Sequence, residues 1–253
     1  MTSLVAGERG AELRGLRQAQ RLAYACAEAV AAQLGPGVTE RGAARMQHDW
    51  LRRHGVRDRF RPPLAWFGDR TAFARVRTPL RFFPTGRRLE RGMPFILHVA
   101  PVYRGHVADA VYSGCLGLDP VHDRLLADLR EHRELILREV RERRPLREIH
   151  QDVDRLTVRQ GYAGRHRARP FGAIAREAGR VRDRRRSPLW PPYGFSGRPP
   201  RPGVWAVGPH LGFRGTGATF EELLVVTDAR DPEESAFWLD DDLPHVRRWT
   251  EGV

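Results

Sequence analysis

Residues 94–113 read Pro94-Phe-Ile-Leu-His98-Val-Ala-Pro-Val-Tyr-Arg-Gly105-His-Val-Ala-Asp109-Ala-Val-Tyr-Ser113, and this stretch decides the fold. Its first residues are apolar except for His98, which predicts a buried strand with one polar side chain. Gly105 predicts a tight turn, and a second strand is expected to open at Asp109. The stretch therefore predicts a hairpin in which His98, in the first strand, and Asp109, at the start of the second, are eleven positions apart.

The composition is that of a soluble globular protein, with 30% charged and 41% hydrophobic residues in a chain of 253. No apolar run reaches the roughly 18 residues of a membrane span. The first residues lack the basic and then apolar order of a secretory signal. Cys26 and Cys115, the two cysteines, lie too far apart in sequence to indicate a disulfide framework or a thiolate metal site. We therefore expect a cytoplasmic protein without a membrane partner.

The net charge is +13, and every one of the 44 basic residues is Arg. With the abundant Ala, Gly and Pro, this usage indicates a GC-rich coding bias, as in actinobacteria. A strongly positive chain can bind nucleic acid. Here, however, the Arg residues are spread along the whole sequence, and the dense run at 180–186 precedes a Pro-rich stretch and is interpreted as an exposed loop. The charge pattern therefore does not favour nucleic acid as a partner.

The hairpin resembles the metal-binding hairpin of the pita-bread superfamily, which includes methionine aminopeptidases, aminopeptidase P, prolidase and creatinase. In that superfamily both positions are Asp, whereas here the second is Asp109 and the first is His98. The opening Gly35-Pro-Gly-Val-Thr39-Glu40, between two helical segments, is also typical of these proteins. The resemblance implies an α+β fold with a curved, mostly antiparallel sheet covered by helices. It implies one catalytic-type domain, 1–253, without the N-terminal domain of aminopeptidase P or creatinase.

Periodicity and turn residues place the remaining elements. We expect helices over about 11–34, 39–54, 119–143 and 146–160, and last strands over 203–210 and 220–227. Thr39 is expected to cap the second helix. Residues 186–203 are predicted to form a long Pro-rich loop that serves as a lid or a partner surface. The acidic and aromatic tail at 237–245 is expected to be a C-terminal cover.

The resemblance implies that Asp109 and Glu221 are the carboxylates that bridge two metals in the superfamily. His98 replaces a terminal Asp ligand, and an imidazole can ligate a metal without contributing charge. His98, Asp109 and Glu221 together could hold a single divalent metal, or His98 could be a general acid or base. A turn Asp, a surface strand Glu and a buried His without chemistry are the structural alternatives. Glu222 is expected on the opposite face of its strand.

Several other positions depart from the superfamily pattern. Gly208 stands where a ligand Glu is expected, and His210, two residues on, could reach the same cavity. His166 is the candidate for the catalytic His of the Gly-rich segment 161–176, although the expected spacing does not survive. The candidate catalytic residues are therefore His98, Asp109, Glu221, His166 and His210. The candidate substrate-binding residues are Arg61 and Arg176, which stand where two family His residues are expected, and Trp66.

These departures predict a repurposed pita-bread enzyme that performs acid/base chemistry at a C–N or C–O bond of a small molecule. It would work without a metal, as creatinase does, or with at most one, and the coding bias suggests a step in specialised-metabolite biosynthesis. A mononuclear metalloaminopeptidase is one alternative. A non-catalytic protein that binds a partner through residues 186–203 is another. We expect a small-molecule or short-peptide substrate, no cofactor or a single divalent metal ion, and a homodimer or a paralogue as partner.

Overall fold

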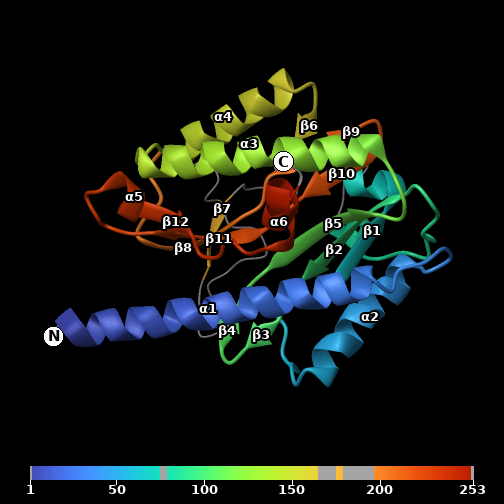
Figure 1. The fold of residues 1–253 in the computed structure, drawn as a ribbon, viewed down its shortest axis with the longest axis horizontal. Coiled ribbons are helices and arrows are strands. Elements are labelled where there is room, and N and C mark those ends of the chain that lie inside the picture. The colour runs from blue at the N-terminus through green and yellow to red at the C-terminus, as the bar shows by residue number, and fades with distance from the viewer. Residues whose placement is uncertain (1, 75–78, 165–174, 179–196, 252–253) are drawn as a thin grey trace.

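The computed structural model describes residues 2–74, 79–164, 175–178 and 197–251 (Figure 1). Four long helices carry most of the helical residues: α1 (Thr2–Ala31), α2 (Glu40–Arg53), α3 (Pro120–Arg141) and α4 (Leu146–Arg159). Two short ones, α5 (Pro232–Ser235) and α6 (Pro244–Glu251), follow near the C-terminus. No helix in the described ranges combines the length and the apolar character that a bilayer crossing needs.

The strands form small antiparallel sheets. One contains β1 (Leu64–Phe67), β2 (Pro94–Val99) and β5 (Ala110–Cys115) in the order β1-β2-β5. Another has the order β12-β11-β8-β7, from β7 (Ala175–Ala178), β8 (Gly203–Val207), β11 (Glu222–Val226) and β12 (Ala236–Trp238). A third joins β6 (Ala163–Gly164), β9 (His210–Phe213) and β10 (Thr216–Thr219). The predicted α+β class with antiparallel sheets is confirmed.

The hairpin predicted from residues 94–113 is present. All six residues of β2 are buried, and β2 is the middle strand of its sheet, so both of its edges are paired. Between β2 and β5, the short strands β3 (Val102–Tyr103) and β4 (His106–Val107) pair across Arg104 and Gly105. These two residues have φ of 49° and 80°, the left-handed pair that a tight two-residue hairpin turn requires. The turn therefore returns the chain to Asp109, directly before β5.

The helices begin close to where their capping residues predict. Thr39 accepts a hydrogen bond from the Gly42 amide at 3.0 Å, and Asp119 accepts one from the Val121 amide at 3.0 Å. The first helix differs from the prediction at both ends, since α1 begins at Thr2 rather than near residue 11 and ends at Ala31 rather than at residue 34. At its end the amides of Gln33 and Leu34 bond to carbonyls three residues back, so the chain leaves the α-helix in a tighter turn.

The C-terminal third also departs from the sequence prediction. The strand expected over 203–210 is two strands, because Pro209 supplies no backbone N–H and the chain bends there. The tail is more than a cover, since β12 pairs with β11 and extends the sheet. Leu239 and Leu243 are buried beyond it.

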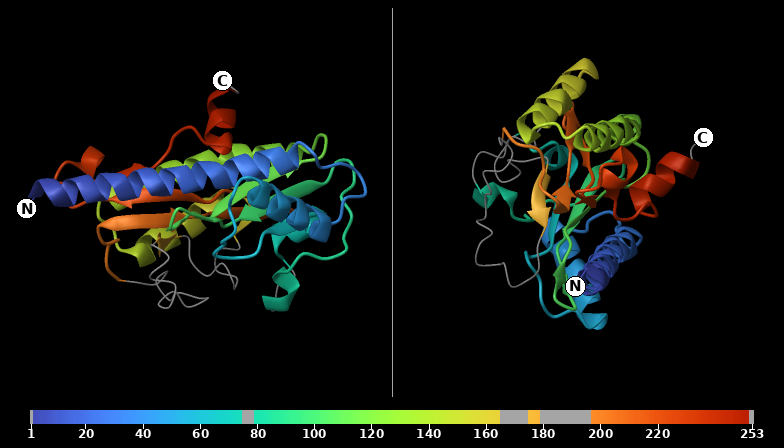
Figure 2. Two further views of the ribbon diagram at one scale, coloured as in Figure 1. Left: turned by 90° about the horizontal axis from the view of Figure 1, so that it is seen from below. Right: turned by 90° about the vertical axis from the view of Figure 1, so that its left-hand side faces the viewer.

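Helices cover the outer side of the strands. Viewed end-on in the right panel of Figure 2, α1, α3 and α6 lie along the same side of the sheets. The core accordingly has two main parts: one between α1, α2 and β1-β2-β5, and one between α3, α4 and β8-β11-β12. These two parts meet where the β5 strand lies beside the start of β11, at a single antiparallel bridge between Val111 and Glu221. The polar residues of interest lie at this junction.

Candidate functional site

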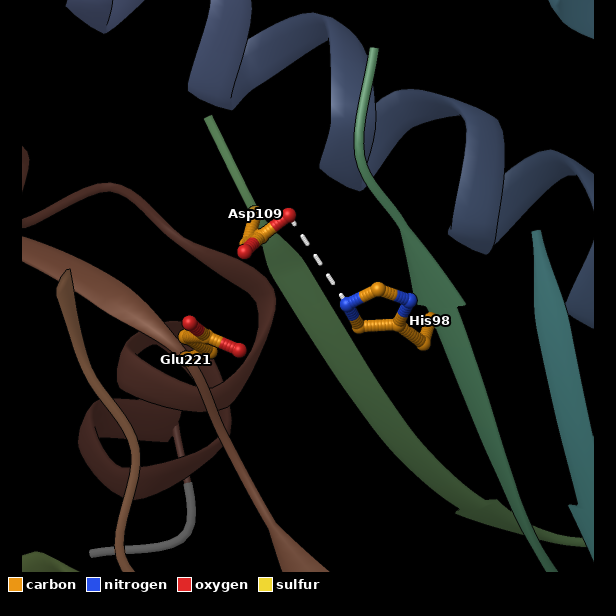
Figure 3. Close-up of side chains that lie close together, drawn as sticks. All are labelled: His98, Asp109 and Glu221. Carbon is orange, nitrogen blue, oxygen red and sulfur yellow. Dashed lines mark ion pairs between the residues drawn. The ribbon is translucent and has the colours of Figure 1, made fainter. Parts of the chain in front are cut away.

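Three polar side chains converge at the junction between the sheets (Figure 3). His98 comes from the middle of β2, Asp109 directly precedes β5, and Glu221 directly precedes β11. Their ligand atoms, one nitrogen and two carboxylate oxygens, all lie within 4.8 Å of one another. Among the described residues, this is the only group of three or more His, Cys, Asp or Glu side chains close enough to share a metal ion.

The hairpin holds His98 and Asp109 rigidly. His98 pairs with Leu64 on one side and Val111 on the other, and its side chain is 3% exposed. Asp109 is 1% exposed, and its Oδ1 lies 3.8 Å from Nε2 of His98, the contact drawn as a dashed line in Figure 3. Both side chains have therefore lost nearly all contact with bulk water. A buried carboxylate beside an imidazole favours the orientation in which Nε2 faces that carboxylate.

Glu221 is brought to the same place from the far end of the sequence. Its backbone forms the bridge to Val111, and its carbonyl accepts a hydrogen bond from the Tyr24 hydroxyl at 2.8 Å. The same hydroxyl lies 3.3 Å from the carbonyl oxygen of Val111. Burial raises the pKa of Tyr24 well above its ordinary value, so the phenol keeps its proton and remains a donor. Tyr24 thus ties the strand after Asp109 to the strand after Glu221.

Glu222 lies on the opposite face of the strand, as its position predicts. It is fully buried, and its carboxylate accepts hydrogen bonds from Arg133 Nε at 2.7 Å and Arg133 Nη2 at 3.2 Å. Nε2 of His245 lies 3.3 Å from Oε1 of Glu222. The neighbouring carboxylates therefore have different environments: Glu222 belongs to an ion pair behind the sheet, and Glu221 faces His98 and Asp109.

Gly208 lies beside Glu221. A Cβ built on Gly208 would be 3.5 Å from Cγ of Glu221 and 3.1 Å from the backbone oxygen of Phe220. A side chain at position 208 would therefore point toward Glu221. Since Gly has no side chain, the chain offers no anionic ligand from this strand.

His210 reaches the same region but is turned to the backbone. Its Nε2 donates to the carbonyl of Thr71 at 2.8 Å, and its ring lies 5.0 Å from that of Phe73. His210, Gly208 and Glu221 line a small cavity of about 20 Å³. A volume of that size holds about one water molecule. His210 is not part of the cluster that His98 forms with Asp109 and Glu221.

Of the predicted substrate-binding residues, Trp66 is buried and Arg61 is partly exposed. Trp66 is 1% exposed in β1, and its indole N–H donates to the carbonyl of Phe82 at 2.8 Å. Its ring lies 6.4 Å from that of His98 and packs against Phe73, so it forms part of the apolar wall behind the imidazole. Arg61 is partly exposed, with its guanidinium carbon 5.3 Å from the centre of the Phe60 ring.

Some of the predicted features fall on residues that the structure does not describe. His166 lies outside the described residues, as do the dense Arg run at 180–186 and most of the loop expected over 186–203. The backbone of Arg176 is described in β7, opposite Ala206 of β8, but its side chain is not. The roles assigned to His166, Arg176 and the loop remain predictions.

The donor set of the cluster fits one divalent first-row metal ion. An imidazole nitrogen suits Zn²⁺, Fe²⁺ or Mn²⁺, and carboxylate oxygens suit Mn²⁺ and other hard cations. The two carboxylates also explain why a cation is favoured, because two negative charges held this close in a buried site repel each other strongly. Gly208, beside Glu221, adds no side-chain ligand to this set.

The sequence and the fold were compared with known proteins. The profile of metallopeptidase family M24 matches residues 14–228. No curated protein matches the sequence. The X-Pro aminopeptidase from Thermotoga maritima MSB8 superimposes with a TM-score of 0.74 at 17% identity, covering 93% of this chain and 62% of that one. The dipeptidase PepE from Mycobacterium ulcerans superimposes with a TM-score of 0.71 at 19% identity, covering 93% and 59%.

A recombinant prolidase from Thermococcus sibiricus gives a TM-score of 0.69 at 16% identity, covering 92% of this chain and 60% of its own. At these identities the structural likeness establishes the fold. The chain spans about three fifths of the length of the three solved structures, so most of its residues have a structural counterpart, whereas a large part of each of those proteins has none here.

Proposed function

Because the chain belongs to metallopeptidase family M24, we propose that it is a hydrolase that cleaves a C–N bond in a short peptide or small molecule with a single divalent metal ion. The ligands would be Nε2 of His98 and the carboxylates of Asp109 and Glu221. One observation carries the proposal: these three side chains, from two distant parts of the sequence, bring their ligand atoms within 4.8 Å of one another.

The ligand set differs in charge from the one that the superfamily pattern implies. His98 contributes a neutral nitrogen where an anion is expected, and Gly208 contributes no ligand. The remaining negative charges, those of Asp109 and Glu221, balance one dication. This balance supports a mononuclear site, because a second dication would have no further carboxylate from the described strands to neutralise it.

A divalent ion in such a site supplies Lewis acidity to a carbonyl oxygen and makes a nearby water a better nucleophile at neutral pH. The protein residues supply the rest. Glu221, the most exposed of the three side chains, can accept a proton from an attacking water at a carboxylate oxygen. Asp109 is held by the hairpin with its Oδ1 3.8 Å from Nε2 of His98, so the two residues would present their ligand atoms to the same ion. The buried surroundings of His98 and Asp109 strengthen these interactions by excluding water.

The test is hydrolysis by metal-stripped and reconstituted protein. Protein treated with EDTA and then supplied with Mn²⁺ or Zn²⁺ would be assayed with dipeptides, including X-Pro dipeptides, and with small N-acyl amides. We expect hydrolysis that depends on the added metal and is lost in Asp109→Asn. A metal-dependent activity that survives Asp109→Asn would contradict the assignment of the site.

A metal-free reaction is the second candidate, and the His98–Asp109 contact at 3.8 Å is the observation that favours it. In that case Nε2 of His98 would carry a proton to or from the C–N or C–O bond, and Asp109 would stabilise the protonated imidazole. Small-molecule turnover in EDTA, lost in His98→Ala, would support this reading. Turnover that requires added metal would exclude it. A role in specialised-metabolite biosynthesis would then depend on which of these substrates is turned over.

A further inference from the structure

A second cavity lies away from the His98 cluster, between the first turns of α3, the end of β5 and α6. We name it the α3–α6 cavity. Its volume is about 350 Å³, within the range that accommodates small organic ligands. It opens to solvent, and its walls include Cys115, His122, Asp123, Leu126, Arg248 and Trp249.

His122 is the first sign that this cavity binds something. The residue is 1% exposed, yet among the described residues neither ring nitrogen has a hydrogen-bond partner. Oδ1 of Asp123 lies 3.6 Å from Nδ1, beyond hydrogen-bonding distance. Burial lowers the pKa of His122, with Asp123 acting against the shift and Arg248 adding to it. Buried polar groups nearly always have partners, so a neutral imidazole without one on a cavity wall indicates a ligand.

Two opposite charges on the same walls are the second sign. Arg248 donates to neutral acceptors only, the carbonyl of Ser113 and the hydroxyl of Tyr112. Within the part of the chain that the structure describes, its guanidinium makes no ion pair with a carboxylate, and Asp123 makes none with an Arg. Arg248 and Asp123 thus line one cavity and both influence His122, but they do not pair with each other.

The two opposite charges on the cavity wall, those of Asp123 and Arg248, are complementary to the two charges of a zwitterion. A guanidinium binds a carboxylate, and a carboxylate binds an ammonium group, each through charge-assisted hydrogen bonds. Leu126, Ala127 and the Trp249 ring supply an apolar wall for a hydrocarbon side chain. We propose that the α3–α6 cavity binds a free α-amino acid with an apolar side chain, its carboxylate at Arg248 and its ammonium group at Asp123.

The test compares three ligands that share one hydrocarbon body. L-leucine carries both charges, 4-methylpentanoate lacks the ammonium group, and 3-methylbutylamine lacks the carboxylate. Binding would be measured by calorimetry or ligand-observed NMR on the full chain in EDTA. We expect leucine to bind and each single-charge analogue to bind more weakly by about two- to fivefold, because one of the two exposed charge pairs is then lost.

Substitutions in and beside the cavity test which residues bind leucine. Because Arg248 and Asp123 are exposed, Arg248→Gln and Asp123→Asn should each weaken leucine binding by about two- to fivefold. Arg247→Gln is the matched control, since Arg247 neighbours Arg248 on α6 but pairs with Glu28 and Asp242. Asp109→Asn should leave leucine binding unchanged, which separates this cavity from the His98 cluster. No leucine binding by the wild type, or binding that Arg248→Gln leaves intact, would overturn the proposal. So would equal binding of the three ligands.

Discussion

Substituting Glu221 and Glu222 separately by Gln tests how the site is built, because the two residues are adjacent and face opposite ways. Glu222 is fully buried and accepts two hydrogen bonds from Arg133, at 2.7 and 3.2 Å. Removing one partner of a buried ion pair costs about 3–5 kcal/mol. Arg133 keeps Asp241 as a partner at 2.8 Å, so we expect Glu222→Gln to lower the free energy of unfolding by about 3 kcal/mol, the lower end of that range.

Glu221→Gln should behave in the opposite way. Its carboxylate lies within 4.8 Å of that of Asp109, and two unit charges at that distance repel by about 3 kcal/mol at an effective dielectric constant of 20. Without metal, the substitution removes this repulsion, so the variant should unfold at the same urea concentration as the wild type or at a higher one. With metal at 100 times the dissociation constant, the wild type should gain about 2.7 kcal/mol, and Glu221→Gln should lose most of this gain.

Urea denaturation followed by far-UV circular dichroism, in EDTA and in Mn²⁺, distinguishes the two effects. Glu222→Gln should be destabilised in both buffers and keep the shift that metal produces in the unfolding midpoint. Glu221→Gln should be stable in EDTA and show little shift. If Glu221→Gln is as unstable as Glu222→Gln in EDTA, or if it keeps the full metal shift, then Glu221 does not face the cluster and the reasoning is wrong.

Three further predictions follow from the contacts around the site and the core. Tyr24→Phe removes the hydroxyl that bonds the Glu221 carbonyl at 2.8 Å, and metal titration should show an affinity weaker by about tenfold with a stability loss of only about 1 kcal/mol. Burial and the neighbouring Asp152 carboxylate raise the pKa of Glu139 to about 7 in the folded protein. Protonated Glu139 therefore contributes its full stabilisation below the pKa that it has in the unfolded chain, and this contribution is lost as the pH rises through about 7. Urea midpoints should therefore fall between pH 5 and pH 8 in the wild type and fall less in Glu139→Gln. Glu40 is fully buried and accepts from Arg70 Nε at 2.7 Å, so Glu40→Gln should cost about 3 kcal/mol in chemical denaturation.

The sequence predicted the parts of the fold that depend on local patterns. The apolar run around His98 and the Gly105 turn are sufficient to define the hairpin, because a buried strand and a left-handed turn each have a strong local signature. Thr39 and Asp119 likewise marked the starts of α2 and α3. The opposite facing of Glu221 and Glu222 followed from the period of two in a strand.

Contacts between distant segments could not be predicted in the same way. Tyr24 lies within the helix predicted over 11–34, and nothing near it in sequence indicates that its hydroxyl reaches the Glu221 carbonyl. His210 was predicted to reach the cavity and lines it with Gly208 and Glu221, but its bond to the Thr71 carbonyl depends on how residues 68–72 fold back after β1. The α3–α6 cavity depends on the placement of α6, for which the sequence shows only an acidic and aromatic tail. The biosynthetic role and the actinobacterial source remain predictions from composition.

The central claim is that His98, Asp109 and Glu221 hold a single divalent ion. Equilibrium dialysis of EDTA-stripped protein against Mn²⁺ or Zn²⁺, followed by elemental analysis, measures this directly. The account predicts one ion per chain in the wild type and none in Asp109→Asn, with circular dichroism showing that the variant is folded. Two ions per chain, no ion in the wild type, or one ion retained by Asp109→Asn would contradict it.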